Sequence, residues 1–325
     1  MGANLKEVRV RIKSVMSTQQ ITKAMKMVSA SKLRRAQQAI VQFRPYSNKM
    51  NEMLTNILAG SSDTTVSYGV AREVKNVCIV VVTSNKGLCG AFNTNVNKAV
   101  VEIVNTKYAA QLAAGKITFL CIGKKGAEFM ARRYKNCTVN TDHIALFTDL
   151  TFDNTALIGE SLMNSFKGGE FDAIEVAYGQ FKNAAMQNFV VEPFLPVAPM
   201  QPTGKKTTAD FEFEPSKQQL LETMVPSILK MQLFKCCLDT HASEHGARMT
   251  SMDKATENAN ELLKELRINY NKARQEAITK ELSEIVGGAN ALEGWSPVSL
   301  SLTKAQSLSK KRVNLNLDKF IHKTL

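Results

Sequence analysis

A 4/3 spacing of mostly apolar residues runs through the second half of the chain, which has no proline between Pro226 and Pro297. Only His245 and Thr256 are not apolar among its members, which are Leu238, Ala242, His245, Met249, Met252, Thr256, Ala259, Leu263, Leu266, Tyr270, Ala273 and Ala277. A repeat of about 3.5 residues held over about five heptads is typical of a coiled-coil seam. We therefore expect one long helix over about 227–286, ended by Gly287, Gly288 and Gly294, with Pro226 in its first turn or at a kink.

The N-terminal segment is the candidate partner for that helix. It has neither proline nor glycine between Ala3 and Arg44, and Pro45 then marks a possible kink. A 4/3 seam begins at Leu5, Val8, Ile12 and Val15. Beyond this point an apolar line (Ile21, Met25, Val28) runs beside a polar line that keeps the original register (Gln19, Thr22, Ser29). We expect the two ends of the chain to pair as an antiparallel coiled coil.

The middle of the chain has a different pattern. Short apolar runs over 77–82, 117–122, 173–181 and 187–196 predict strands, and helical patterns lie over about 94–113, 126–134 and 155–166. Strands that alternate with helices indicate an open, partly parallel α/β sheet of four or five strands. The fold class is therefore α/β plus all-α, with a Rossmann-like domain inserted into a coiled coil. The expected division is 1–60, 72–200, 210–294 and a basic tail, 295–325.

Charge is concentrated at the two ends of the chain. The net charge is +13; residues 1–50 hold eleven Lys and Arg against one acid, and residues 295–325 hold six against one. An acidic partner should therefore meet the first helix or the tail. The basic residues of that helix could form a solvated face, a nucleic-acid-binding surface or a docking surface for an acidic protein. Its lack of interleaved aromatic residues disfavours stacking on single strands, and docking on a protein is preferred.

The cysteines and the apolar runs indicate the kind of cellular compartment in which the chain is found. None of the six cysteines forms a C-x-x-C pair, which favours reduced thiols. No apolar run approaches the roughly 18 residues of a membrane span, and no signal-peptide core is evident at the N-terminus. We expect a soluble chain that meets a membrane only through partners.

Two motifs suggest chemistry but remain weak. His241, Glu244 and His245 have the H-x-x-E-H spacing of a zinc site, although His245 lies on the seam and no third ligand is near. Gly87 and Gly90 lie in a strand-to-helix turn that could bind phosphate, but it lacks the spacing of the dinucleotide and P-loop motifs. A zinc enzyme and a coiled-coil nucleic-acid adaptor stay as alternatives, and no cofactor is expected.

Four segments closely resemble the γ subunit of F-type ATP synthases. They are residues 17–28 (STQQITKAMKMV), 83–90 (TSNKGLCG), 242–249 (ASEHGARM), and 278–281 (ITKE) with Glu284, Gly288 and Ala289. The likeness spans roughly residues 1–293. It implies a non-catalytic rotor: the terminal helices form a shaft inside an α3β3 hexamer, and proton-driven rotation of a c ring changes the β catalytic sites in turn. It also implies ε and δ subunits as partners, without nucleic acid.

The same resemblance assigns roles to single positions. Contact and coupling with β fall to Lys23, Met25, Lys26, Lys86, Cys89, Arg248, Arg274, Gln275, Thr279 and Glu281. A foot near the c ring and ε falls to Phe211, Glu212, Phe213, Glu214 and Pro215. Met25 is equally well explained as a seam residue. Lys86 replaces the usual Arg of the family, which keeps the charge and loses the bidentate fork.

The tail and the location of the protein complete these expectations. The tail from Trp295 has no recognised counterpart in the family; its two period-two alternations could form a hairpin, but we expect it to be disordered. The absence of a transit peptide favours the cytoplasmic face of a bacterial inner membrane over the mitochondrial matrix or chloroplast stroma.

Overall fold

The computed structural model describes residues 5–59, 68, 72–197 and 217–293. It divides into two compact units, residues 14–263 and residues 1–13 with 264–325, and each is described by itself. The predicted foot at 211–215 and the tail at 295–325 lie outside the described residues. The four-part division predicted from the sequence stays a prediction.

The larger unit contains a five-stranded sheet. Its strands are β1 (Val77–Val82), β2 (Ile117–Ile122), β3 (Thr138–Asn140), β4 (Ala173–Phe181) and β5 (Gln187–Leu195), in the order β3-β2-β1-β4-β5. The first four strands pair in parallel, and β5 runs antiparallel to β4. Every residue of β1 is buried, as its unbroken β-branched and apolar sequence predicts for a central parallel strand.

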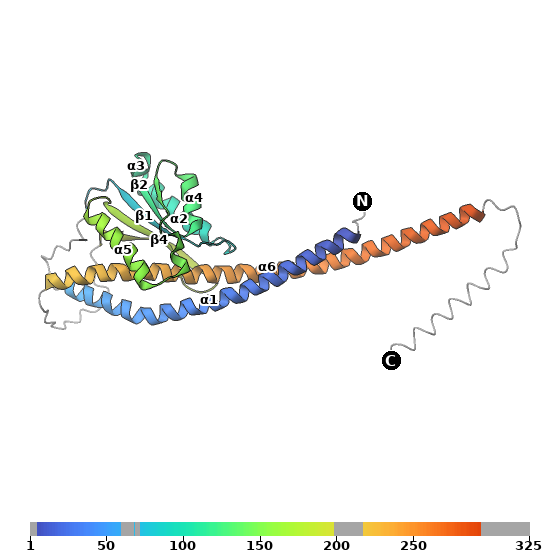
Figure 1. Ribbon diagram of the computed structural model, residues 1–325, viewed down its shortest axis with the longest axis horizontal. Helices are drawn as coiled ribbons and strands as arrows, with labels where there is room; N and C mark the ends of the chain where they lie inside the picture. The colour runs from blue at the N-terminus through green and yellow to red at the C-terminus, as the bar shows by residue number, and fades with distance from the viewer. Residues whose placement is uncertain (1–4, 60–67, 69–71, 198–216, 294–325) are drawn as a thin grey trace. The chain divides into compact units, whose positions relative to one another are not determined.

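Helices cover both faces of this sheet (Figure 1). They are α2 (Phe92–Thr106), α3 (Ala109–Ala113), α4 (Lys124–Arg133), the 3-10 turn η1 (Ile144–Thr148) and α5 (Phe152–Lys167). Alternate β1 residues enter two cores: Ile79 packs in the cluster that holds α2 and α4 residues, and Val80 in the cluster that holds α5 residues. Leu233 and Cys237 of the long C-terminal helix belong to the second cluster, so that helix is part of the α/β core.

The two long helices are α1 (Leu5–Ala59) and α6 (Lys217–Glu293). In the larger unit they run antiparallel: Thr22 bonds Thr256, and Lys26, further along α1, pairs with the earlier residue Asp253. In the smaller unit Arg9 Nη2 donates to Tyr270 Oη at 2.8 Å. Every predicted α6 seam residue from Leu238 to Ala277 is buried or half-buried. The predicted fold class is confirmed.

Several boundaries differ from the sequence prediction. Helix α6 begins at Lys217, which places Pro226 in its interior, and it passes through Gly287 and Gly288 to Glu293. Pro45 also lies inside an unbroken helix. Pro226 is half-buried beside core residues of α6, so packing can override its local preference, whereas Pro45, Gly287 and Gly288 are exposed and nothing in the structure explains the unbroken helix there. The sequence also missed β3 and η1, which are too short for a periodic signal, and it joined α2 and α3.

Candidate functional site

Side-chain hydrogen bonds from within the loop and from α2 hold the loop that follows β1. Ser84 Oγ donates to the Lys86 carbonyl at 2.7 Å, and Asn93 Nδ2 of α2 donates to Cys89 Sγ at 3.2 Å. Cys89 is buried beneath the loop, whereas Leu88 is 60% exposed. Leu88 adopts φ +63°, a left-handed conformation that is uncommon for a residue with a side chain. The loop therefore presents an apolar side chain to solvent from a constrained backbone.

Arg248 of α6 holds the same loop from the side. Its Nη2 donates to the Lys86 carbonyl at 3.0 Å and to the Gly87 carbonyl at 3.2 Å, and its Nε donates to the Gly87 carbonyl at 3.3 Å. Its counter-ion is Glu244, one helical turn earlier, at 2.6 Å. Both side chains of this pair are largely buried. Burial raises the pKa of Glu244, and the Arg248 charge opposes that rise. Arg248 thus joins the long helix to the β1 loop.

Two histidines continue this network. A guanidinium only donates, so His245 Nδ1 accepts from Arg248 Nη1 at 3.2 Å. His245 Nε2 must then carry the proton and donate to His241 Nε2, which lies 3.2 Å away. Burial and the nearby cations lower the pKa of His241 to about 4 and that of His245 to about 3. The His241 ring also stacks on Phe147 with a 6.0 Å centroid distance.

This network leaves no support for the zinc hypothesis. The two Nε2 atoms bond each other, and Glu244 is committed to Arg248. Among the described residues no group of three or more His, Cys, Asp and Glu could hold a metal ion. Glu244 and His245 of the H-x-x-E-H spacing belong to the ASEHGARM segment (242–249), and their ties to Arg248 help to hold the loop.

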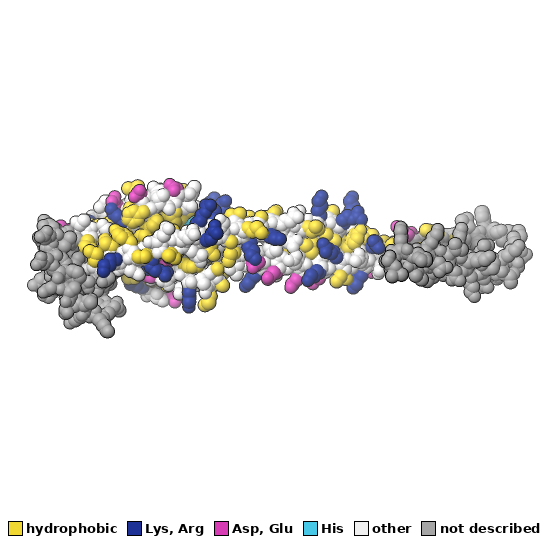
Figure 2. Space-filling view, turned by 90° about the horizontal axis from the view of Figure 1, so that it is seen from below, with side chains coloured by type: hydrophobic (Ala, Val, Ile, Leu, Met, Phe, Trp, Pro, Cys, Tyr) yellow, Lys and Arg dark blue, Asp and Glu magenta, His cyan; other side chains and the backbone are white. Residues whose placement is uncertain are grey.

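A groove of about 650 Å³ lies between α1, α6 and the β1 loop. Its apolar lining includes Ile21, Met25 and Val28 of α1, together with Leu88 and Phe147. Lys32, Lys86 and Arg248 line it as well. Ile21 is 57% exposed, Val28 58% and Met25 38%. Figure 2 shows hydrophobic and basic side chains interspersed on the face of the molecule seen from below. An apolar floor among cations is suited to a partner that is apolar and acidic.

The predicted coupling residues divide between the two units. Met25, Lys86 and Arg248 line this groove, and Cys89 supports its loop from beneath. Lys23 is exposed on α1, and Lys26 is half-buried against Asp253. Arg274, Gln275, Thr279 and Glu281 belong to the smaller unit, where they are exposed on α6. There the Thr279 hydroxyl donates to its own helix, at the Gln275 carbonyl.

Met25 is not a seam residue. On α1 the polar line is buried, with Thr22 at 9% exposure and Ser29 at 2%, and the apolar line faces outward. The alternative explanation of Met25 given by the sequence is therefore wrong. Sequence reasoning also missed Leu88, Phe147 and Asp253. The i, i+4 spacing of Glu244 and Arg248 was the one signal that could have indicated the buried ion pair.

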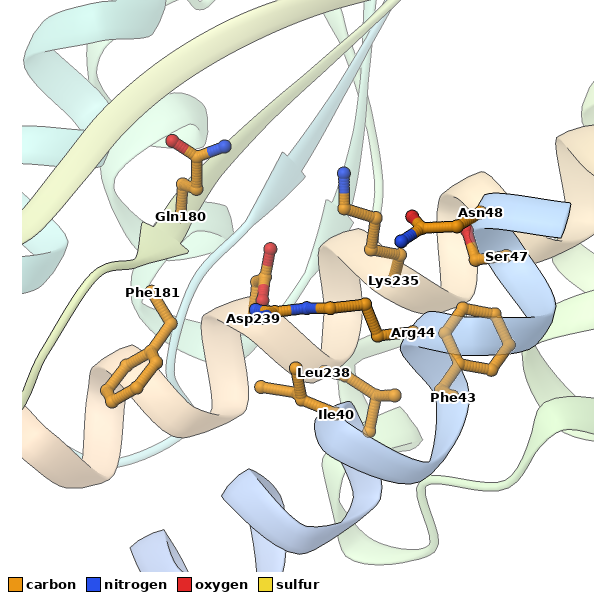
Figure 3. Close-up of a pocket in the computed structure, with 10 residues that line it drawn as sticks. All are labelled: Ile40, Phe43, Arg44, Ser47, Asn48, Gln180, Phe181, Lys235, Leu238 and Asp239. Atoms are coloured by element: carbon orange, nitrogen blue, oxygen red, sulfur yellow. The ribbon is translucent and has the colours of Figure 1, made fainter. Parts of the chain in front are cut away.

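A second, smaller pocket of about 250 Å³ lies between α1, the end of β4 and α6 (Figure 3). Asp239 lies at this pocket and is 6% exposed. Burial raises its pKa to about 6, although Lys235 and Arg44 act in the opposite direction. Figure 3 shows the Arg44 side chain extending from α1 toward Asp239.

Comparison with known protein families gives a consistent result. The family model described as "ATP synthase" matches residues 4–292. An ATP synthase gamma chain from Cytophaga hutchinsonii is 50% identical over 293 residues, which cover 89% of this chain and 99% of the relative. One from Flavobacterium psychrophilum is 51% identical over 294 residues, covering 90% and 100%. The matching relatives thus end close to where the predicted tail begins.

Solved structures give the same fold. A chain of the Euglena gracilis mitochondrial ATP synthase, in an assembly of OSCP, F1 and c-ring, matches with a TM-score of 0.63 at 21% identity, covering 92% of this chain and 98% of that one. A chain of the Tetrahymena thermophila mitochondrial ATP synthase central stalk and c-ring matches with a TM-score of 0.50 at 25% identity, covering 72% and 99%.

Within the described helices, none has the length and apolar character needed to cross a bilayer.

Proposed function

The chain belongs to the ATP synthase gamma chain family, and we propose that its groove between α1, α6 and the β1 loop is where a β subunit engages it. As a member of this family it is the central-stalk subunit of an ATP synthase, and the chemistry of ATP takes place on the β subunits. The alternatives of a zinc enzyme and a nucleic-acid adaptor have no support.

The observation that carries this proposal is the composition of the groove. Ile21 and Val28 expose more than half of their surface although a buried seam runs one position away on the same helix. Lys32 and Lys86 line the groove together with the Arg248–Glu244 ion pair, and the resulting net positive charge attracts an acidic partner. An acidic, partly apolar helix or loop of a β subunit has both features that the groove complements.

The groove would transmit force without locking. The apolar contacts with Met25 and its neighbours are non-directional, and exposed charge pairs are individually weak, about 0–1 kcal/mol each. Arg248 keeps the loop rigid, so a displacement of the long helices carries Leu88 with it. Each orientation of the stalk then favours one conformation of the β subunit that it touches, and rotation shifts the equilibria of the catalytic sites in turn.

Further partners of this chain follow from its family. We propose that it assembles with an α3β3 hexamer, with ε and δ subunits and with a c ring, which its structural relatives contain in part. Arg274, Gln275, Thr279 and Glu281 would contact a second part of β, and residues 211–215 would lie near the c ring. The protein would then be peripheral, at the cytoplasmic face of a bacterial inner membrane.

Co-expression with α and β subunits from the same source tests this proposal. We expect a complex with one copy of this chain per three αβ pairs, isolated by gel filtration. ATP hydrolysis by that complex should fall several-fold with Met25→Lys, which places a cation on the apolar floor, and should also fall with Gln275→Ala.

Met27→Lys is the matched control, because Met27 is 63% exposed on α1 and does not line the groove. Hydrolysis should be nearly unchanged in that complex. Equal losses with the Met25 and Met27 variants would show that the groove has no special role, and a chain that elutes apart from α and β would contradict the assembly itself.

A further inference from the structure

Helix α1 has two competing faces between residues 19 and 29. The apolar line of Ile21, Met25 and Val28 lies one position, or about 100°, from the polar line of Gln19, Thr22 and Ser29. Within residues 19–29, burial of apolar surface would favour turning the apolar line toward α6. The structure has the opposite arrangement: Thr22 and Ser29 are buried, and Ile21 and Val28 are exposed. Leu33 and Ala36, which continue the register of the polar line, are buried.

The facing stretch of α6 is also polar. Thr22 Oγ1 and Thr256 Oγ1 lie 2.8 Å apart; one hydroxyl donates to the other, and the accepting hydroxyl donates to a carbonyl of its own helix, that of Gln19 for Thr22 or of Met252 for Thr256. Gln19 donates to Asn260, and Lys26 forms an ion pair with Asp253. Ser29 is satisfied by the Met25 carbonyl at 2.8 Å. Every one of these seam side chains therefore has a partner.

The apolar line would remove the α1 partners of this stretch of α6. If α1 turned by one position, Asp253, Thr256 and Asn260 would face Met25 and its apolar neighbours, which can neither donate nor accept a hydrogen bond. Asn260 is exposed and the Asp253 side chain is 45% exposed, so water can hydrate both; the turn costs the Lys26–Asp253 ion pair and the Thr22–Thr256 and Gln19–Asn260 hydrogen bonds. Polar seam positions are known to select one arrangement of a coiled coil at the expense of stability.

We propose that Asp253, Thr256 and Asn260 are positioning residues, which extend the register fixed by the buried Leu33 and Ala36 through residues 19–29 and so keep α1 rotated with its apolar line facing outward. The purpose of that rotation rests on the proposed function, because the line forms the floor of the groove. The rotation itself does not, since it is a property of the chain alone. The two ideas can therefore fail separately.

Methionine oxidation measures the rotation directly. Met25 is 38% exposed in the groove, and Met27 is 63% exposed on the other side of the polar line. In the full-length chain, the variant Asp253→Leu/Thr256→Leu/Asn260→Leu makes the facing stretch of α6 apolar. We expect Met25 to oxidise several-fold more slowly in this variant, measured by mass spectrometry after dilute peroxide, while Met27 keeps its rate.

The matched control adds the same three leucines one position along, at Lys254→Leu/Glu257→Leu/Glu261→Leu, on residues that are exposed in the structure. Met25 should oxidise there as in the unaltered chain. An unchanged Met25 rate in the seam variant, or equal protection in both variants, would overturn the proposal.

A charge exchange keeps the proposal testable if the leucine variant fails to fold. Lys26→Asp places two carboxylates together and should lower the melting temperature and change the oxidation rate of Met25. Lys26→Asp/Asp253→Lys restores the pair with reversed polarity and should restore both values. Failure of the double variant to recover the Met25 rate would also contradict the proposal. If Met25 is protected as expected but hydrolysis by the assembled complex is unaffected, the rotation is established and the proposed docking is wrong.

Discussion

Two stretches of helix α6 are both helical but differ in burial: one is covered by the rest of the chain and the other is exposed. Between residues 236 and 246 every residue except His241 is buried, including Asp239, Glu244 and His245. Between residues 281 and 291 every residue is exposed, including Leu282 and Ile285. The first stretch is covered by the sheet on one side and by α1 on another, whereas no described residue covers the second. A helix that is buried all round is a core element, and one with bare apolar residues indicates a surface for another molecule.

The largest expected effect lies in the covered part of the helix. Leu233 is fully buried in the cluster that joins α6 to α5 and the sheet. Leu233→Ala should lower the free energy of unfolding by ~2–5 kcal/mol because it leaves a cavity in a packed core. Urea unfolding followed by circular dichroism measures the loss. A change below about 1 kcal/mol would mean that α6 is not part of the α/β core.

The histidine pair should make the covered stretch sensitive to acid. Because folding lowers the pKa values of His241 and His245, their contribution to stability is present above about pH 6.5 and is lost as the pH falls toward 4. We expect this loss to lower the melting temperature of the chain over this range. His241→Gln/His245→Gln should flatten that dependence, whereas His143→Gln, outside the pair, should retain it. Melting temperatures between pH 7 and pH 4 compare the three chains.

Asp239 should respond to pH in the opposite direction. Its pKa is raised on folding to about 6, so its contribution to stability is present below about pH 4 and is lost as the pH rises through 6. Asp239→Asn should therefore stabilise the chain at pH 7.5 by ~2 kcal/mol and change little at pH 4. Chemical denaturation at both pH values provides the test, and equal effects at the two values would contradict the burial of an ionisable carboxyl.

The smallest effect is expected in the uncovered stretch. Leu282 is 56% exposed, so Leu282→Ala repeats the Leu233 substitution on the same helix without removing a packed side chain. The free energy of unfolding of the isolated chain should change by less than ~0.5 kcal/mol. In complexes with α and β, the same substitution should weaken assembly, measured by gel filtration at decreasing concentration. A large loss in the isolated chain would show that this stretch is covered by its own chain.

Sequence pattern predicted α6 better than α1 for a physical reason. The α6 seam residues from Leu238 to Ala277 are mostly apolar, so hydrophobic periodicity finds them directly. On α1 the buried positions at Thr22 and Ser29 are polar, and they are satisfied by partners that lie more than two hundred residues away or by their own helix. Hydrophobic periodicity does not show whether a buried polar side chain finds a hydrogen-bond partner far away in the sequence. The outward apolar line was visible in the sequence, but its direction depended on those partners.

The candidate site divides in a similar way. The likeness of short segments indicated Met25, Lys86 and Arg248, and the structure brings these three to one groove. Leu88 could not have been singled out, because its exposure depends on a left-handed backbone that only the folded loop reveals. The strands from β1 to β5 were predicted where apolar runs are long. The three-residue β3 was not predicted, because it is too short for a hydrophobic pattern and is defined by its pairing with β2.

The burial of the thiols has a practical consequence for work on this rotor. All six cysteines are unpaired; five are buried, and burial raises the pKa values of Cys78, Cys121, Cys236 and Cys237. Such thiols are poor nucleophiles at neutral pH because little thiolate is present. A single cysteine introduced on the exposed end of α6 would react with a maleimide dye far faster than the native ones. The chain can thus carry one fluorescent label that reports rotation without prior replacement of its native cysteines.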